Sequence, residues 1–217
     1  SNRFACASLT LGDVATKITV TWKPYGTAAV IDNCIWSNAV LSVNNDRTHV
    51  MDGKWTVMGE GETAHQFKAS GGAMNFNMRQ EMYGEHGVSV YYDGFGNVDK
   101  PNLLIISGDF SHYKGQIRAS KCAYVALNSP TATGEVSEPR EDAILLDGDG
   151  GFMINPAVQD QLSPLRGICL HAGTNCLYTD KSTYKAYVVK VPITGNETEG
   201  TLKKIGPGEV TLDCAYT

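Results

Sequence analysis

Residues whose types and spacing could do chemistry are few in this chain of 217 residues. In Gly108-Asp109-Phe110-Ser111-His112, a carboxylate, a hydroxyl and an imidazole lie within four positions. A hydrolytic triad needs a base within hydrogen-bond reach of its nucleophile and a third group that orients the base. No nucleophile elbow or oxyanion-hole motif accompanies these residues. We therefore favour a polar turn over a secreted hydrolase that would use Asp109, His112 and a distant Ser or Glu.

Two further carboxylates, Asp147 and Asp149, lie two positions apart in a glycine-rich turn and could offer oxygens to calcium. An EF-hand loop needs further ligands and a distal Glu, whereas apolar residues follow here. A tight turn is favoured, and calcium binding stays open. Cys169, His171 and Cys176 lack the paired spacing of structural zinc ligands. The sequence predicts no metal site and no cofactor.

Aromatic residues gather beside Gly-, Asn- and Asp-rich connections in the middle of the chain. Amphipathic rings with nearby amides and carboxylates suit carbohydrate or protein recognition. We predict a ligand-binding surface there. Tyr91 and Tyr92 are adjacent, so one of them must face the core if the strand Val88–Tyr92 is regular. The candidate residues are Tyr83, Tyr91, Tyr92, Phe95 and Tyr113.

Six cysteines run from one end of the chain to the other. An even number in a chain rich in β-branched residues is typical of disulfides formed in an oxidising compartment, so we expect an extracellular or cell-surface protein. Six cysteines allow fifteen connectivities, which the sequence does not resolve. Proximity favours Cys169–Cys176, then Cys6–Cys34, and leaves Cys122–Cys214.

Alternation with a period of two indicates β-strands. In the first strand Val14, Ile18, Val20 and Trp22 share one face, and the pattern recurs in a second strand. The predicted strands are Val14–Trp22, Ile35–Val43, Trp55–Met58, His65–Ala69, Met74–Arg79, Val88–Tyr92, Leu103–Ser107, Gln116–Ala119, Cys122–Leu127, Ala143–Leu146, Tyr184–Val191 and Glu209–Tyr216.

A short helix is predicted over Ala157–Leu162, because Asn155 and Pro156 form a capping pair and Pro164 ends the pattern. The stretch from Asn128 to Asp142 predicts a long exposed loop. We find no internal repeat of fixed period. The strand spacing predicts one domain over residues 1–217, an immunoglobulin-like antiparallel β-sandwich stapled by disulfides.

The net charge of −5, without a Lys/Arg cluster, argues against nucleic-acid binding. No stretch approaches the ~20 apolar residues that span a membrane. No basic-then-apolar leader is present, so any signal peptide is expected to have been removed. One sequon, at Asn196, permits a secretory origin without requiring one.

The two terminal strands resemble those of bacterial chaperone–usher pilus subunits. Thr16–Trp22 is similar to their alternating donor strand, and Glu209–Thr217 resembles their final strand. The resemblance implies an immunoglobulin-like subunit completed by a strand from a periplasmic chaperone or a neighbouring subunit. It also implies candidate strand-exchange residues, which are Ile18, Val20, Trp22, Val210, Leu212 and Tyr216.

Together these features predict a non-catalytic extracellular adhesin or pilus-type subunit that binds a host glycan or protein receptor. A receptor-binding spike domain of a virus is the alternative, and a secreted hydrolase is the less favoured third class.

Overall fold

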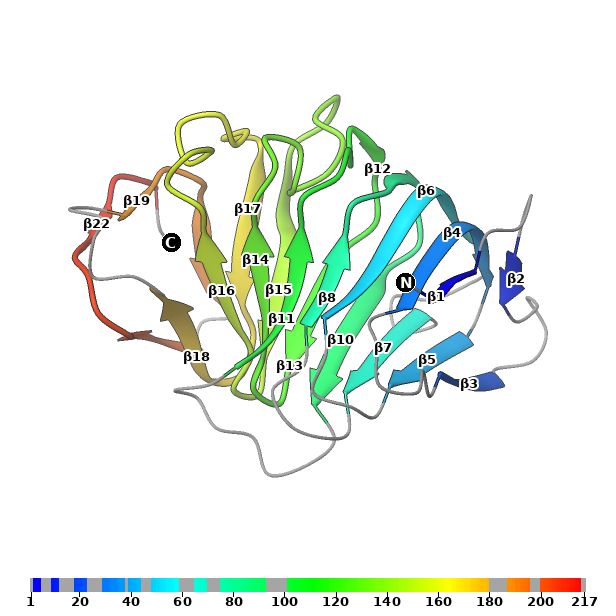
Figure 1. The fold of residues 1–217 in the computed structure, drawn as a ribbon. Coiled ribbons are helices and arrows are strands. Elements are labelled where there is room, and N and C mark those ends of the chain that lie inside the picture. The colour runs from blue at the N-terminus through cyan, green and yellow to red at the C-terminus, as the bar shows by residue number, and fades with distance from the viewer. Residues whose placement is uncertain are drawn as a thin grey trace.

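The computed structural model describes residues 2–4, 9–11, 18–22, 29–37, 39–43, 48–58, 65–69, 75–92, 101–179, 187–195 and 200–215. Across these residues the chain winds as a solenoid, in which each coil contributes one strand to each of two facing sheets (Figure 1). Successive coils stack from the blue N-terminal end to the red C-terminal end of the figure. Because each coil rests on the next, residues far apart in sequence become neighbours across a strand spacing of about 4.8 Å.

The strands form a 12-stranded sheet A, an 8-stranded sheet B and a separate pair. Sheet A contains β1 (Asn2–Phe4), β2 (Leu9–Leu11), β4 (Ala29–Ser37), β6 (Thr48–Met58), β8 (Asn75–Met78), β9 (Glu81–Gly84), β11 (Asn102–Ile106), β12 (His112–Tyr113), β14 (Ala123–Leu127), β16 (Gly151–Ile154), β18 (Gly173–Tyr178) and β21 (Gly200–Ile205). Sheet B contains β3 (Ile18–Trp22), β5 (Ala39–Val43), β7 (His65–Ala69), β10 (Val88–Tyr92), β13 (Ile117–Ser120), β15 (Arg140–Asp147), β17 (Arg166–Leu170) and β20 (Ile193–Gly195). The separate pair is β19 (Tyr187–Val189) with β22 (Val210–Leu212).

The predicted all-β class is confirmed, but the immunoglobulin-like antiparallel sandwich is wrong. Each pairing between described strands is parallel. From β3 to β8 and from β13 to β18, successive strands of the chain alternate between sheets A and B. A half-buried strand alternates with a period of two in either kind of sheet, so the sequence pattern does not report strand direction. The protein is therefore a parallel β-solenoid.

The coils vary in length, which explains why no fixed period is visible in the sequence. Residues in register along sheet A are separated by steps of 20, 27, 28, 21 and 27 positions. These residues are Val30, Val50, Asn77, Ile105, Ala126 and Met153. The strands keep their register while the connecting turns absorb the differences in length.

The core consists of ladders of apolar side chains that stack from coil to coil between the two sheets. One ladder from each sheet has members that are at most 5 % exposed. Burial of continuous apolar columns supplies the main stabilising free energy, about 25 cal/mol per Å² removed from water. In sheet A the ladder is Met51, Met78, Ile106, Leu127 and Ile154; in sheet B it is Val88, Ile117, Ile144, Ile168 and Ile193.

The predicted helix over Ala157–Leu162 is wrong, and the described residues contain no helix, let alone one long and apolar enough to cross a membrane. Asn155 does accept a hydrogen bond from the Ala157 backbone on its side-chain oxygen, at 3.0 Å. The following turns are closed by bonds three residues apart, from Val158 to Asn155 and from Gln161 to Val158. A segment this short cannot offset the cost of helix nucleation unless tertiary packing supports it, and here it forms consecutive turns.

The predicted disulfide staples are also wrong. Cys122, Cys169, Cys176 and Cys214 are free thiols, so Cys169–Cys176 and Cys122–Cys214 are not formed. Cys169 lies on β17 of sheet B and Cys176 on β18 of sheet A. Although only seven positions separate them along the chain, they belong to different sheets. The third predicted pair involves Cys6, which lies outside the described residues.

The segment predicted as a long exposed loop connects β14 to β15. Strand β15 begins at Arg140, so the irregular part spans residues 128–139. Ser129, Ala132 and Thr133 are buried, whereas residues 136–139 are exposed. The first half of this connection therefore packs on the solenoid and can hold side chains in fixed positions.

Lowering the pH from 7.5 to 5 should reduce the free energy of unfolding because of His49. This residue is 2 % exposed beside Phe76, and burial lowers its pKa below the ordinary 6.5. The unfolded state therefore binds more protons as the pH falls through 6.5, at a cost of at most about 1.4 kcal/mol per pH unit. Urea unfolding at several pH values should show the slope, and His49→Gln should flatten it. A stability that is unchanged between pH 7.5 and 5 would contradict this prediction.

Candidate ligand-binding groove

The Asp109–His112 segment forms a turn and brings no nucleophile to the imidazole. The Asp109 carboxylate accepts hydrogen bonds from the Ser111 backbone at 2.9 Å and from the Thr131 hydroxyl at 3.3 Å, and these bonds lower its pKa. The His112 ring instead stacks on Tyr83, with 4.9 Å between ring centroids. This geometry matches the polar turn that the sequence favoured.

Tyr83 belongs to a polar stack on the outer face of sheet A. The Lys54 ammonium lies 4.1 Å from the Tyr83 ring centroid, and His112 covers the other face. The Tyr83 hydroxyl donates to Glu81 at 3.2 Å. Both faces of this candidate ring are therefore occupied by the protein, so a ligand could reach only its edge or the outer face of His112.

The other aromatic candidates do not share one surface. Tyr113 is fully buried, and its hydroxyl donates to the backbone carbonyls of His86 and Gln116. Tyr91 lies on the outer face of β10, where the Lys121 ammonium is 5.6 Å from its ring centroid. Tyr92 ends β10 and Phe95 lies outside the described residues. Of the predicted residues whose side chains the structure describes, Tyr91 lines a hollow on the surface.

The candidate strand-exchange residues lie in strands that already pair within the solenoid. Ile18, Val20 and Trp22 lie in β3, which pairs in parallel with β5. Val210 and Leu212 lie in β22, which pairs with β19; Val210 packs against the core and Leu212 is 46 % exposed. Tyr216 lies outside the described residues. Strand exchange with another subunit stays a prediction.

A groove of three adjoining pockets follows the strands of sheet B on their outer face. We call them the corner, central and far pockets, with volumes of about 330, 820 and 500 Å³. Pro139 and Arg140 line both the corner and the central pocket, and Arg118 lines both the central and the far pocket. From Arg140 to Asp147 the groove follows about 23 Å of β15. This length fits an extended polymer better than a compact small molecule.

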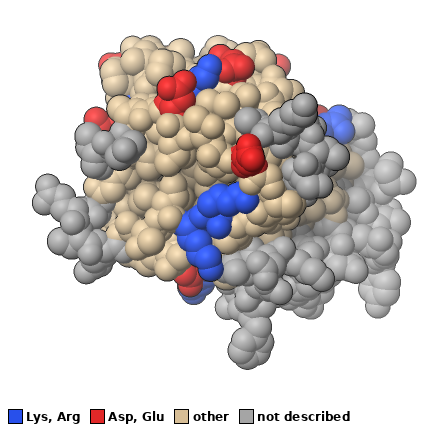
Figure 2. Space-filling model, turned by 90° about the vertical axis from the view of Figure 1, so that its left-hand side faces the viewer, with Lys and Arg blue, Asp and Glu red and all other residues tan. Residues whose placement is uncertain are grey.

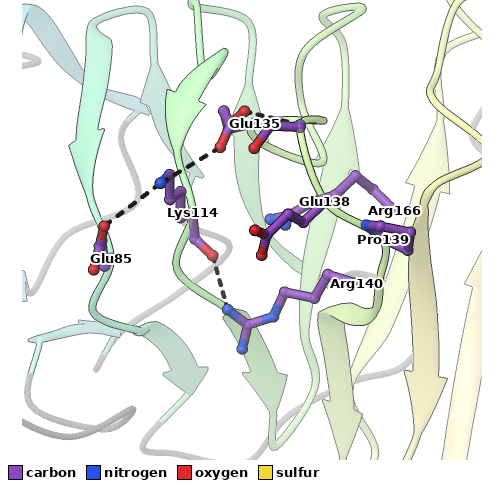
Figure 3. Close-up of a pocket in the computed structure, with 8 residues that line it drawn as sticks. Glu85, Lys114, Glu135, Glu138, Pro139, Arg140 and Arg166 are labelled. Atoms are coloured by element: carbon purple, nitrogen blue, oxygen red, sulfur yellow. Dashed lines mark hydrogen bonds and ion pairs between the residues drawn. The ribbon is translucent and has the colours of Figure 1, made fainter.

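The corner pocket lies where the strands of sheet B begin (Figure 3). The Lys114 ammonium bridges Glu85 at 3.7 Å and Glu135 at 4.0 Å, and the Lys114 carbonyl accepts a bond from Arg140 at 2.7 Å. Hydrogen bonds from Ser137 to the Glu135 carboxylate lower its pKa. The lining residues are Glu85, Lys114, Glu135, Ser137, Glu138, Pro139, Arg140 and Arg166.

The central pocket contains a hydrogen-bonded array centred on Asp142. The Asp142 carboxylate accepts one bond from the Gln116 amide at 2.6 Å and another from Arg140 at 2.8 Å. Leu145, Cys169 and Thr194 lie nearby on three successive strands of the sheet. The wall therefore combines polar groups held by hydrogen bonds with less polar side chains from three neighbouring strands.

On the neighbouring part of the groove, Asp147 binds the guanidinium of Arg118 and the imidazole of His171. Its carboxylate accepts bonds from Arg118 and, at 3.1 Å, from Nδ1 of His171. Burial raises the pKa of Asp147, but these two partners lower it more, so the group stays ionised. Among the described residues no hydroxyl or thiol hydrogen-bonds to the His171 ring, so a triad is not assembled.

Each of the three pockets contains one buried side-chain atom without a hydrogen-bond partner. They are Nη2 of Arg166 in the corner pocket, Oε1 of Gln116 in the central pocket and Oγ of Ser89 in the far pocket. Buried polar atoms are nearly always satisfied, and leaving one unpaired costs about 1–3 kcal/mol. These three atoms lie just beneath the groove surface, and no described protein group pairs with them.

Neither turn carboxylate forms a metal centre with its neighbours. Asp147 is engaged by Arg118 and His171, and Asp149 has a left-handed backbone with φ of 64°. In the part of the chain that the structure describes, no cluster of three or more His, Cys, Asp or Glu side chains could hold a metal ion.

The C-terminal end of the solenoid carries a second hollow of about 540 Å³ over the last coils. Figure 2 faces this end and shows a largely uncharged surface crossed by basic side chains. Strand β21 contributes exposed Lys203 and Lys204 at this edge. Lysines on an edge strand discourage further strand pairing, so this feature is explained by protection of the sheet edge.

Comparison of the chain with protein-family models, curated proteins and solved structures finds no match. The groove is therefore interpreted from its own chemistry. Sequence reasoning identified Tyr91 and weighed Asp147 but missed Gln116, Arg118 and Asp142. Gln116 and Arg118 lie on a strand that the sequence predicted, which was a usable signal, whereas Asp142 ends the segment predicted as a loop. Their meeting in one groove depends on the register of the coils.

Proposed function

We propose that this β-solenoid binds an oligosaccharide along the outer groove of sheet B and does so without catalysis. The observation that carries the proposal is the run of three adjoining pockets whose walls are lined by carboxylate, amide and guanidinium groups. Sugar hydroxyls donate and accept hydrogen bonds, so a single class of ligand can pair with all of these groups. The predicted glycan receptor of an adhesin is the function closest to this chemistry.

The charges of the groove support a binding role. Asp142 and Asp147 are held by Arg140, Gln116, Arg118 and His171, so these carboxylates can orient sugar hydroxyls without acting as proton donors. A general acid would need a raised pKa, whereas the pKa of Asp147 is lowered. Planar polar side chains combined with the Tyr91 ring suit the polar edges and apolar faces of sugars.

A glycan array followed by calorimetric titration tests the proposal. We expect the intact chain to bind at least one class of oligosaccharide, and Asp147→Asn to weaken that binding about tenfold, because Arg118 and His171 lose a charged partner. Asp160→Asn is the matched control, since it breaks an exposed ion pair with Lys190 on a different surface. An array without any bound glycan, or equal binding by the folded Asp147→Asn variant, would contradict the proposal.

Other parts of the predicted function keep the status of predictions. A protein receptor, neighbouring subunits and a periplasmic chaperone are partners expected from the sequence alone. The cell-surface location was argued from disulfides, and the free thiols of Cys122, Cys169, Cys176 and Cys214 remove that argument.

A further inference from the structure

The corner pocket contains a buried cation that its neighbours do not neutralise. Arg166 begins β17 and is 3 % exposed, yet its guanidinium makes one hydrogen bond, from Nε to the Thr133 carbonyl at 2.8 Å. Its Nη2 atom is buried without a partner, and no described carboxylate lies within ion-pair distance of the guanidinium. Burying a charge without a paired, hydrogen-bonded partner costs several kcal/mol. A positive group in this position calls for an anion.

A second guanidinium lies close enough to Arg166 to repel it. Burial lowers the pKa of Arg166 first, and the positive charge of Arg140 lowers it further. Glu135 and Asp142 oppose this effect in part, but both already accept hydrogen bonds from other groups. Arg140 is paired with Asp142, so Arg166 is the guanidinium of this pocket that lacks an ion-pair partner among the described residues.

The remaining carboxylates of the pocket leave room for an incoming anion. Glu85 is paired with Lys114, and its side chain is 74 % exposed. Glu138 is exposed in the connection before β15. Figure 3 shows Lys114, Glu138, Arg140 and Arg166 arranged around the same pocket. The floor is thus basic and the rim acidic, which would admit one anionic group and disfavour a densely charged polymer.

We infer that the corner pocket binds a carboxylate of an acidic sugar, so that the ligand of the outer groove is a glycan with a uronic-acid residue at this end. This inference rests on the proposed function. A planar carboxylate can accept two parallel bonds from a guanidinium, and such charge-assisted pairs are about twice as strong as neutral hydrogen bonds. Neutral hydroxyls would then occupy the central and far pockets.

The test compares three hexasaccharides that share one β-1,4-linked backbone: cellohexaose, the same chain oxidised at C6 of one terminal residue only, and the methyl ester of that single uronate. We expect the uronate to bind the intact chain about tenfold more tightly than the methyl ester, and the difference to shrink in high salt. Equal affinity for the uronate and its ester would overturn the acidic-sugar inference and leave the glycan proposal standing. Failure of all three, together with an empty array, would remove both.

Two substitutions, one that removes a positive charge and one that removes a negative charge, then locate the carboxylate site while the buried Arg166 is kept. Arg140→Gln should reduce the preference for the uronate over its ester several-fold, because one of the two cations is lost. Glu138→Gln should increase the preference, because the rim loses a negative charge. Lys190→Gln removes a positive charge outside the groove and should leave the preference unchanged. An unaltered preference in both groove variants would overturn the placement in the corner pocket.

Discussion

Replacing Trp55 with alanine should lower the free energy of unfolding by about 3–5 kcal/mol. Trp55 and Trp36 are fully buried, and their rings meet edge to face with centroids 5.8 Å apart. The Trp55 indole also donates to the Asp52 carbonyl at 3.1 Å, so its polar atom is satisfied inside the core. Removal of this side chain leaves a large cavity between neighbouring coils.

Urea denaturation followed by circular dichroism measures this loss. Leu165→Ala is the control, because Leu165 is 45 % exposed and its truncation should change the stability by at most about 0.5 kcal/mol. In a solenoid each coil is stabilised mainly by its neighbours, so a broadened transition in the Trp55 variant would indicate local unfolding of its coils. A loss below about 1 kcal/mol would show that Trp55 is not packed as described.

Replacing Gly134 with alanine should destabilise the protein by about 2–4 kcal/mol and disrupt the corner pocket. Gly134 has φ of 94°, a conformation that residues with a Cβ rarely adopt. A Cβ at this position would lie 2.5 Å from the Tyr113 carbonyl and 2.7 Å from Nη2 of Arg166. The connection would have to move away from Arg166, and with it the pocket wall formed by Glu135.

Gly148→Ala separates the backbone strain from the steric clash of the added Cβ. Gly148 also has positive φ, 51°, but nothing lies within 4 Å of its added Cβ. We expect this variant to lose about 1–2 kcal/mol from backbone conformation alone. The Gly134 variant should lose more and should also lose the preference for an acidic sugar. Equal destabilisation of the two variants would mean that the contact with Arg166 does not restrain the connection.

Local sequence patterns identified strands well. His65–Ala69 and Val88–Tyr92 were predicted with the bounds of β7 and β10, and Cys122–Leu127 differs from β14 by one residue. This agreement is expected, because the alternation of apolar residues is set by burial of one face of a strand. The alternation does not depend on which strand lies beside it.

Strand direction and partners required information that short segments lack. Antiparallel hairpins and parallel coils can use the same alternating strands, and here the connections return each strand to a parallel neighbour. The variable coil lengths hid the repeat, and the even number of cysteines favoured disulfides such as Cys169–Cys176, whose two residues in fact lie in different sheets. Free thiols such as Cys176 are buried as small apolar side chains.

In the groove, too, single residues could be predicted from the sequence, whereas their neighbours depended on how the strands pair. From the sequence, Tyr91 was a candidate ligand-binding residue and Asp147 was a possible calcium ligand, each judged by its immediate neighbours. Parallel register places Ser89 beside Arg118, Arg118 beside Leu145, and Ser120 beside Asp147, although about 25–30 positions separate the partners along the chain.

By itself the sequence determined that the chain is made of short strands with one buried face, that it carries no clear catalytic motif, and that its charge is modest. Only the tertiary structure decided that these strands wind as a solenoid, that the thiols of Cys122, Cys169, Cys176 and Cys214 stay free, and which polar residues line one groove. The physical reason is that burial acts on each residue locally, whereas stacking aligns residues according to the length of every preceding coil.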